Sequence, residues 1–204
     1  GTIDKPFATL GKAQTNEICL HAVKNYGQAL KFVKEQTDEI IWEAIRNSGC
    51  ALKYANKQND ELCMMAVKHN GLALEFVKNQ TPKICLAAIK QNGYAIEFVK
   101  DQTPEICLAA VKKNGNTIEY IHNQTPEVCM ISVEYNGYNL RFVKDQTYEI
   151  CLAAIMSEPL AIEHVKEQTD ELCTIAIRKN YNAINYVRNR TPEHFIEALK
   201  KNGN

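Results

Sequence analysis

Several features that mark membrane proteins or nucleic-acid-binding proteins are missing from this sequence. Its 204 residues contain no apolar run of the 18 or more residues that a membrane-spanning helix needs. The first residues, Gly1 to Lys5, do not have the layout of a signal peptide. Lys plus Arg and Asp plus Glu number 24 each, so the formal net charge is zero. We therefore expect a soluble chain with no membrane contact, and the charge balance disfavours nucleic acid as a partner.

Motifs of catalysis and of metal binding are also absent. No C-x-x-C motif or close Cys/His pair provides the ligand spacing of a structural zinc site, and no Ser/His/Asp set or glycine-rich phosphate loop is present. The five histidines fall at five different positions of the repeat described next: His21, His69, His122, His164 and His194. A site built from repeats would repeat its residues. We expect no enzymatic activity, no metal and no cofactor.

One phrase, Q-T-P-E-I-C-L-A-A-V-K-x-N-G-x-A-I-E-F-V-K-x, fills the chain by recurring end to end without insertion or deletion. We call the residues at one position of the repeat a column. The Thr column is Thr15, Thr37, Asn59, Thr81, Thr103, Thr125, Thr147, Thr169 and Thr191. A fixed period predicts a solenoid in which each unit contacts its neighbours. We expect a lead-in over residues 1–13 and an array over 14–204, with eight full repeats and a partial ninth. Since the sequence starts without Met and stops within a repeat, we expect it to be a piece of a longer chain.

Each repeat carries the signals of two helices. Thr, often followed by Pro and then usually by Glu, is an N-cap, a first helical residue and an acid that matches the helix dipole. The helix runs through I-C-L-A-A-V and should end at Asn-Gly, where we expect a left-handed glycine stop. A second, shorter helix over A-I-E-F-V-K follows. The expected fold is all-α, a solenoid of short helical hairpins stacked in a right- or left-turning superhelix.

Three further columns predict how the hairpins pack. A small column, Ala in eight of nine copies and Ser132 in the other, suggests close approach between helices. An aromatic column in the second helix, such as Phe76 and Phe98, would supply the larger filler of the core. In the seventh repeat Pro159 replaces the glycine of the stop. Because proline cannot adopt a left-handed conformation, we expect the turn over residues 156–160 to differ from the others.

Seven of the eight cysteines share one column: Cys19, Cys63, Cys85, Cys107, Cys129, Cys151 and Cys173. Equivalent residues in stacked repeats lie roughly 8–10 Å apart, whereas a disulfide wants its Cα atoms within about 7 Å. We therefore expect small buried side chains, kept reduced in a cytoplasmic location. Cys50 lies outside the column and should be more exposed.

The repeat E-I-C-L-A-A-V-K-x-N-G-x-A-I-E-F-V-K resembles a family of tandem helical repeats known as a domain of unknown function, found in giant viruses of amoebae and in bacteria. The resemblance covers residues 14–204 and rests on the joint Glu, Cys, Ala, Gly and Val columns. It implies an α-helical repeat array and provides no catalytic residue.

The leading functional hypothesis is a non-catalytic scaffold that binds a protein or peptide, because structural columns leave the variable columns free to recognise a partner. The aromatic candidates in or near these columns are Tyr94, Tyr135, Tyr138 and Trp42. Scattered exposed tyrosines are common, and Trp42 also suits a packing role in its Leu/Met column.

Two alternatives remain open. A basic column in the second helix could bind a polyanion or nucleic acid: Lys34, Lys78, Lys100, Lys144, Lys166 and Arg188. Glutamates three residues earlier, such as Glu75 and Glu97, favour a solvated ion-paired face instead. The array could also be the targeting or spacer arm of a larger protein. The partner and the oligomeric state do not follow from the sequence.

Overall fold

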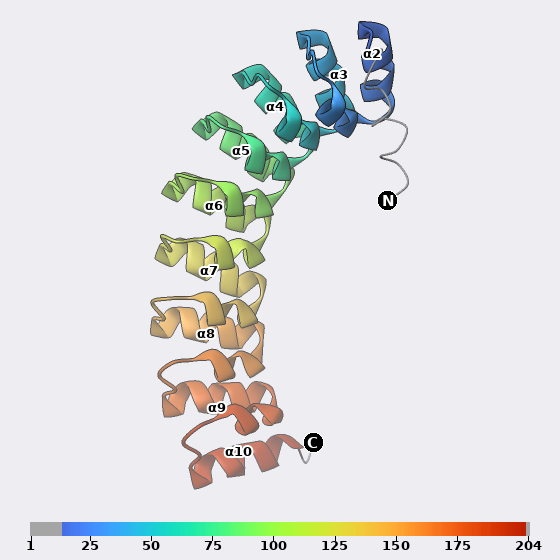
Figure 1. Ribbon diagram of the computed structural model, residues 1–204. Helices are drawn as coiled ribbons and strands as arrows, with labels where there is room; N and C mark the ends of the chain where they lie inside the picture. Colours follow the sequence, from blue (N-terminus) through green and yellow to red (C-terminus); the bar gives the residue numbers. More distant parts are fainter. Residues whose placement is uncertain (1–13, 203–204) are drawn as a thin grey trace. The chain divides into compact units, whose positions relative to one another are not determined.

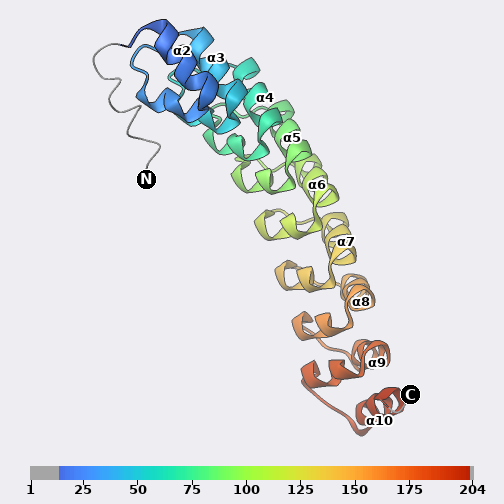
Figure 2. The ribbon, with the colours of Figure 1, turned by 90° about the vertical axis from the view of Figure 1, so that its right-hand side faces the viewer.

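A computed structural model describes residues 14–202, which form nine α-helices and eight 3-10 helices without any strand (Figure 1). The predicted all-α repeat solenoid is thus confirmed. The chain divides into two compact units, residues 1–101 and 102–204. Within each unit, the α-helices form one layer and the 3-10 helices form a second layer beside it (Figure 2).

Helices of the two kinds alternate strictly along the chain. The first unit contains α2 (Asn16–Asn25), η2 (Gly27–Phe32), α3 (Asp38–Asn47), η3 (Gly49–Tyr54), α4 (Asp60–His69), η4 (Gly71–Phe76), α5 (Pro82–Gln91) and η5 (Gly93–Phe98). The second contains α6 (Pro104–Lys113), η6 (Gly115–Tyr120), α7 (Pro126–Tyr135), η7 (Gly137–Phe142), α8 (Tyr148–Ser157), η8 (Pro159–His164), α9 (Asp170–Lys179), η9 (Tyr181–Tyr186) and α10 (Pro192–Asn202).

The Thr column caps the α-helices as predicted. The Thr37 hydroxyl accepts a hydrogen bond from the Ile40 N–H, and Asn59 does the same for the Leu62 N–H. Pro82 stands at the first position of its helix, where a missing N–H costs nothing. These contacts satisfy donors that every helix start leaves unpaired.

The second element of each repeat is a 3-10 helix, which differs from the expected α-helix. It starts at the Gly column and ends at the aromatic column, as in η3 over Gly49–Tyr54. Its bonds join residues three apart, such as the Ala55 N–H to the Leu52 carbonyl at 3.2 Å. Six residues between two extended segments suit the tighter 3-10 form, which proteins use in short pieces.

The expected left-handed stop is wrong, because no described residue, glycine or otherwise, has a positive φ. The residue before Gly49 is extended instead, with Ser48 at φ −147° and ψ 114°. Glycine is required by close packing: a Cβ on Gly49 would lie 2.5 Å from the carbonyl oxygen of Ala66 in the next repeat. The glycine column and the small column therefore face each other across the repeat boundary.

The expected irregularity at Pro159 is wrong for the same reason. Glu158 has φ −135° and ψ 102°, close to the −156° and 112° of Asn114 in the fifth repeat. Its N–H bonds to the Ala154 carbonyl at 2.8 Å, as the Asn114 N–H bonds to Ala110 at 2.9 Å. Proline fits because the first residue of a 3-10 helix has a negative φ.

The core between the two layers consists of aliphatic side chains. Ile40, Ile45 and Leu52 are fully buried, and so is the small-column residue Ala44. The aromatic column does not supply the main filler that the sequence suggested, because residues such as Phe76 are only partly buried and Tyr186 is 39% exposed. Leu and Ile two residues before the aromatic residue take that role.

The glutamine before each Thr joins the start of its repeat to the end of the same repeat. In all eight repeats Oε1 accepts a hydrogen bond from the backbone N–H 20 residues later, as from Lys144 to Gln124 at 3.0 Å. Nε2 donates to the carbonyl 18 residues later, as from Gln124 to Phe142 at 2.9 Å. We call this pair of bonds the glutamine clamp.

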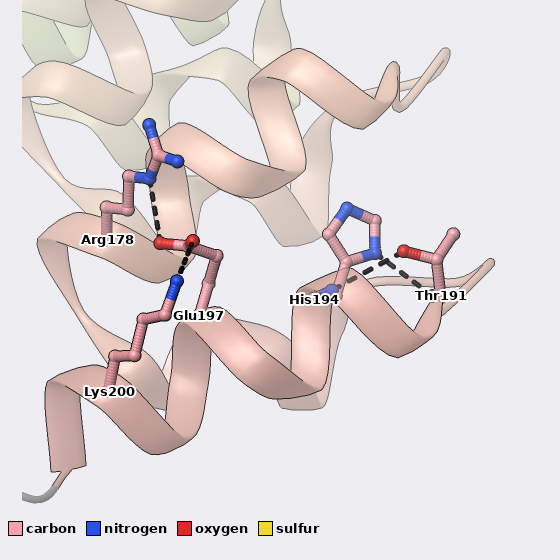
Figure 3. Close-up of polar contacts among 5 residues, drawn as sticks. All are labelled: Arg178, Thr191, His194, Glu197 and Lys200. Carbon is pink, nitrogen blue, oxygen red and sulfur yellow. Dashed lines mark hydrogen bonds and ion pairs between the residues drawn. The ribbon is translucent and has the colours of Figure 1, made fainter.

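The ninth repeat is held by side-chain contacts of a different kind (Figure 3). Arg190 takes the place of the clamp glutamine and donates to the Ile184 and Asn185 carbonyls of the preceding repeat. The Glu197 carboxylate receives Arg178 of α9 at 2.8 Å and Lys200 of α10 at 3.2 Å. Hydrogen bonds from these two cations lower the pKa of the Glu197 carboxyl to about 2.

The substitution Gly49→Ala should destabilise the chain by about 1–3 kcal/mol, because the new methyl group meets a backbone carbonyl that cannot rotate away. Gly49→Asn should cost at least as much. The exposed neighbour Asn56→Ala is the control and should change the free energy of unfolding by less than about 0.5 kcal/mol. Urea unfolding measures all three. A smaller cost for Asn than for Ala would instead favour a left-handed glycine.

Candidate functional site

An open groove lies on the α-helical layer of the first unit, beside Trp42. Its volume is ≈ 540 Å³, within the range of ligand-binding pockets. Trp42 of α3, Met64 and Met65 of α4, and Ile84 of α5 supply its apolar lining. The Trp and both Met side chains are partly exposed, whereas Ile84 is buried. We call this hollow the Trp42 groove.

The repeat geometry explains why these residues meet. Trp42 and Met64 stand one repeat apart in the same column, and Met65 follows in the next column. The 3-10 helix of each repeat returns the chain to the starting side, so α3, α4 and α5 run parallel and side by side (Figure 1). One column therefore becomes a row of side chains across neighbouring helices.

Charged residues surround the apolar lining. Asp60 and Glu61 lie at the start of α4, and Lys68 lies near its end. Lys83 stands at the start of α5, where every other repeat carries Glu. A cation in the first helical turn opposes the helix dipole, at a cost of roughly 0.3–1 kcal/mol. Departures of this kind that do not serve stability are expected at functional sites.

The predicted tyrosines fall in two units. Tyr94 belongs to η5 of the first unit and is partly buried. In the second unit, Tyr135 ends α7 and is 60% exposed, whereas Tyr138 is partly buried and its ring meets His164 edge-on at 6.0 Å. Burial, together with the Glu158 carboxylate, raises the pKa of Tyr138.

The column that contains Tyr135 is less free to vary than the sequence suggested. In the first unit, Asn47, His69 and Gln91 accept a hydrogen bond from the glycine N–H of the preceding repeat, as Asn47 does from Gly27 at 2.7 Å and Gln91 from Gly71 at 2.6 Å. Tyr135 instead lies directly over Gly115, where its Cβ and ring carbons are the nearest atoms. It is therefore a large exposed aromatic residue in a column that provides hydrogen-bond acceptors in three repeats of the first unit.

The basic column forms hydrogen bonds with the backbone. Lys100 Nζ donates to the Lys78 carbonyl at 2.9 Å, Lys144 Nζ to the His122 carbonyl at 2.7 Å, and Arg188 to the Lys166 carbonyl at 2.9 Å. Lys166 bonds to the Lys144 carbonyl in the same way. A Lys or Arg side chain that already donates a hydrogen bond to a backbone carbonyl has fewer N–H donors left for a phosphate. This column therefore has a partly structural role.

The seven cysteines of the Cys column are buried as predicted, and Cys50 is partly buried. Burial raises the pKa of each thiol in the column. The Cys129 thiol donates to Oε1 of Gln124 at 3.8 Å, which connects it to the glutamine clamp. Within residues 14–202, no three His, Cys, Asp or Glu side chains are placed to hold a metal, and no helix is long and apolar enough to cross a membrane.

Two features of the structure were not recognised from the sequence. The clamp glutamine is invariant in eight repeats, and that invariance was the available signal. The Trp42 groove combines departures from the consensus in three consecutive repeats: Trp42, Met64, Met65 and Lys83. Aligning these departures by column would have placed them together.

A family described as a domain of unknown function (DUF4116) matches residues 37–81, 59–103, 81–125 and 103–146. Each match starts one repeat after the previous match and spans two repeats, so the matches follow the period of the sequence. Together they cover more than half of the chain and include every residue that lines the Trp42 groove. No curated protein and no solved structure matches the chain.

In the native protein Cys50 should react with a thiol reagent before the seven cysteines of the Cys column, because those thiols are buried and protonated. Kinetics of labelling at pH 8, followed by mass spectrometry of peptides, measure the order. Eight thiols should react once the chain is denatured without reductant. Fewer than eight, or early labelling of Cys107, would contradict the packing described above.

Proposed function

The chain belongs to the DUF4116 family, a domain of unknown function, and on that premise we propose that it is a non-catalytic scaffold that binds a protein or peptide. The Trp42 groove is the observation that supports this proposal most strongly. In this groove, partly exposed apolar side chains line a hollow of ≈ 540 Å³ with charged residues at its edge. Such a composition is typical of a binding surface.

The residue types of the groove favour a protein or peptide partner. Tryptophan is enriched among the residues that contribute most to binding energy at interfaces. The two flexible methionines can adapt their shape to the side chains of a partner. Solenoids use their long surfaces in this way, because equivalent positions in successive repeats line up.

Tyr135 and Tyr138 supply a second proposed surface, on the second unit. Tyr135 is exposed and lies over Gly115, and a large exposed aromatic side chain there is more than a purely structural role requires. Tyr94 is retained as a proposed contact of the first unit. Polyanion binding along the basic column ranks lower, because its cations donate to backbone carbonyls. The cytoplasmic location remains a prediction.

Selection from a display library of random peptides, each long enough for four helical turns, tests the proposal without knowledge of the natural partner. Peptides enriched on the wild-type chain should bind the Trp42→Ala variant roughly 30-fold more weakly, the loss expected for a residue that contributes about 2 kcal/mol. The Met65→Glu variant should also bind these peptides more weakly than the wild-type chain does. Circular dichroism of each variant verifies that the helices remain.

Tyr135→Ala is the matched control for the groove, because it removes an aromatic side chain from the other unit. Peptides that bind the groove should be unaffected by it. Peptides that lose affinity only with Tyr135→Ala would move the binding surface to the second unit. No enrichment, or enriched peptides that ignore all three substitutions, would contradict the proposal.

A further inference from the structure

The charges at the edge of the Trp42 groove are arranged along the axis of α4. Asp60 and Glu61 occupy its first turn, and Lys68 occupies its last turn. Glu61 and Lys68 are separated by about 10 Å along the axis, which is two helical turns. Arg46 and Lys90 hold the same position in α3 and α5 as Lys68 does in α4, so the helix ends near the groove are basic.

We propose that the occupant of the Trp42 groove is an amphipathic helix that lies antiparallel to α4, an inference that rests on the proposed function. Its apolar side chains, spaced three and four residues apart, contact Trp42, Met64 and Met65. Its first turn is acidic and lies over Lys68. Its last turn is basic and lies over Asp60 and Glu61.

The antiparallel direction follows from three electrostatic effects that agree. A helix is stabilised by acids in its first turn and bases in its last turn, so the charges that complement the groove also stabilise the occupant. Antiparallel helix dipoles attract each other. The carbonyl groups left unpaired at the end of the occupant lie next to Lys83, whose ammonium group can donate to them.

Lys83 is accounted for by this arrangement. A Glu in its place, as in the other repeats, would face the negative end of the occupant's dipole. The exchange of Glu for Lys at this one start of a helix therefore favours an occupant whose terminal carbonyl groups lie beside Lys83 and whose basic side chains are directed away from it, toward Asp60 and Glu61. In the absence of an occupant, the same exchange destabilises α5, because Lys83 opposes the dipole of that helix.

Stapled peptides four helical turns long, which is about 14 residues, test the proposal on the full chain and contain no tryptophan. The matched peptide has Glu in its first turn, Leu at positions 4, 8 and 11, and Lys in its last turn. The reversed peptide exchanges Glu and Lys. A hydrocarbon staple on the face away from Leu keeps both helical. Since Trp42 is the one tryptophan of the sequence, its fluorescence reports occupancy of the groove directly.

The matched peptide should shift the emission of Trp42 to the blue in a saturable way, and the reversed peptide should bind at least about tenfold more weakly. The protein variant Glu61→Lys/Lys68→Glu should invert this preference. Glu17→Lys/Lys24→Glu is the matched control, because it makes the same exchange in α2 outside the groove, and it should leave the preference unchanged.

A third peptide separates this inference from the proposed function. Proline and β-branched residues keep this peptide in an extended conformation. Its Glu and Lys stand three residues apart, which again spans about 10 Å. If it saturates the groove and the stapled peptides do not, the helical occupant is wrong while the peptide-binding function stands. The inference is overturned if the matched and reversed peptides bind equally well, or if neither peptide changes the fluorescence emission of Trp42.

Discussion

The two ends of each repeat are joined by a glutamine side chain that takes the place of a backbone peptide. The amide of Gln124 accepts from the Lys144 N–H and donates to the Phe142 carbonyl, as a neighbouring β-strand would. Phe142 is the last residue of η7 and Lys144 follows the helix, so neither group has a partner within the helix. The bond to the Phe142 carbonyl is part-buried, and a fully buried peptide group without a partner would cost about 1–3 kcal/mol, so the clamp stabilises an irregular connection inside a stacked array.

The clamp also determines which columns can vary. The glutamine, the Cys thiol beside it, the glycine that faces a carbonyl and the small residue that carries this carbonyl are tied to one geometry. The outer residues of the α-helical layer take part in none of these contacts. Trp42, Met64 and Met65 could therefore depart from the consensus without disturbing the stacking, and the groove lies where the clamp leaves the sequence free.

The period and the caps were enough to predict the all-α solenoid, because both are local properties of the sequence. The helix type and the glycine were misjudged, since Gly49 is selected by Ala66 in the next repeat and not by its own φ. The same contact explains why Pro159 leaves its turn unchanged. Trp42 was named as a candidate, but its neighbours Met64 and Lys83 become visible only when consecutive helices are laid side by side. Whether Tyr135 and Tyr138 bind a partner remains a prediction.

Hydrogen exchange of the Lys144 amide tests the clamp most directly. This N–H lies outside every helix in an exposed segment, yet Gln124 accepts its hydrogen bond at 3.0 Å. We predict protection similar to that of the amides inside α7, and its loss in the Gln124→Ala variant while the α7 amides stay protected. Exchange of Lys144 as fast as that of the neighbouring Asp145 in the wild-type chain would contradict the account.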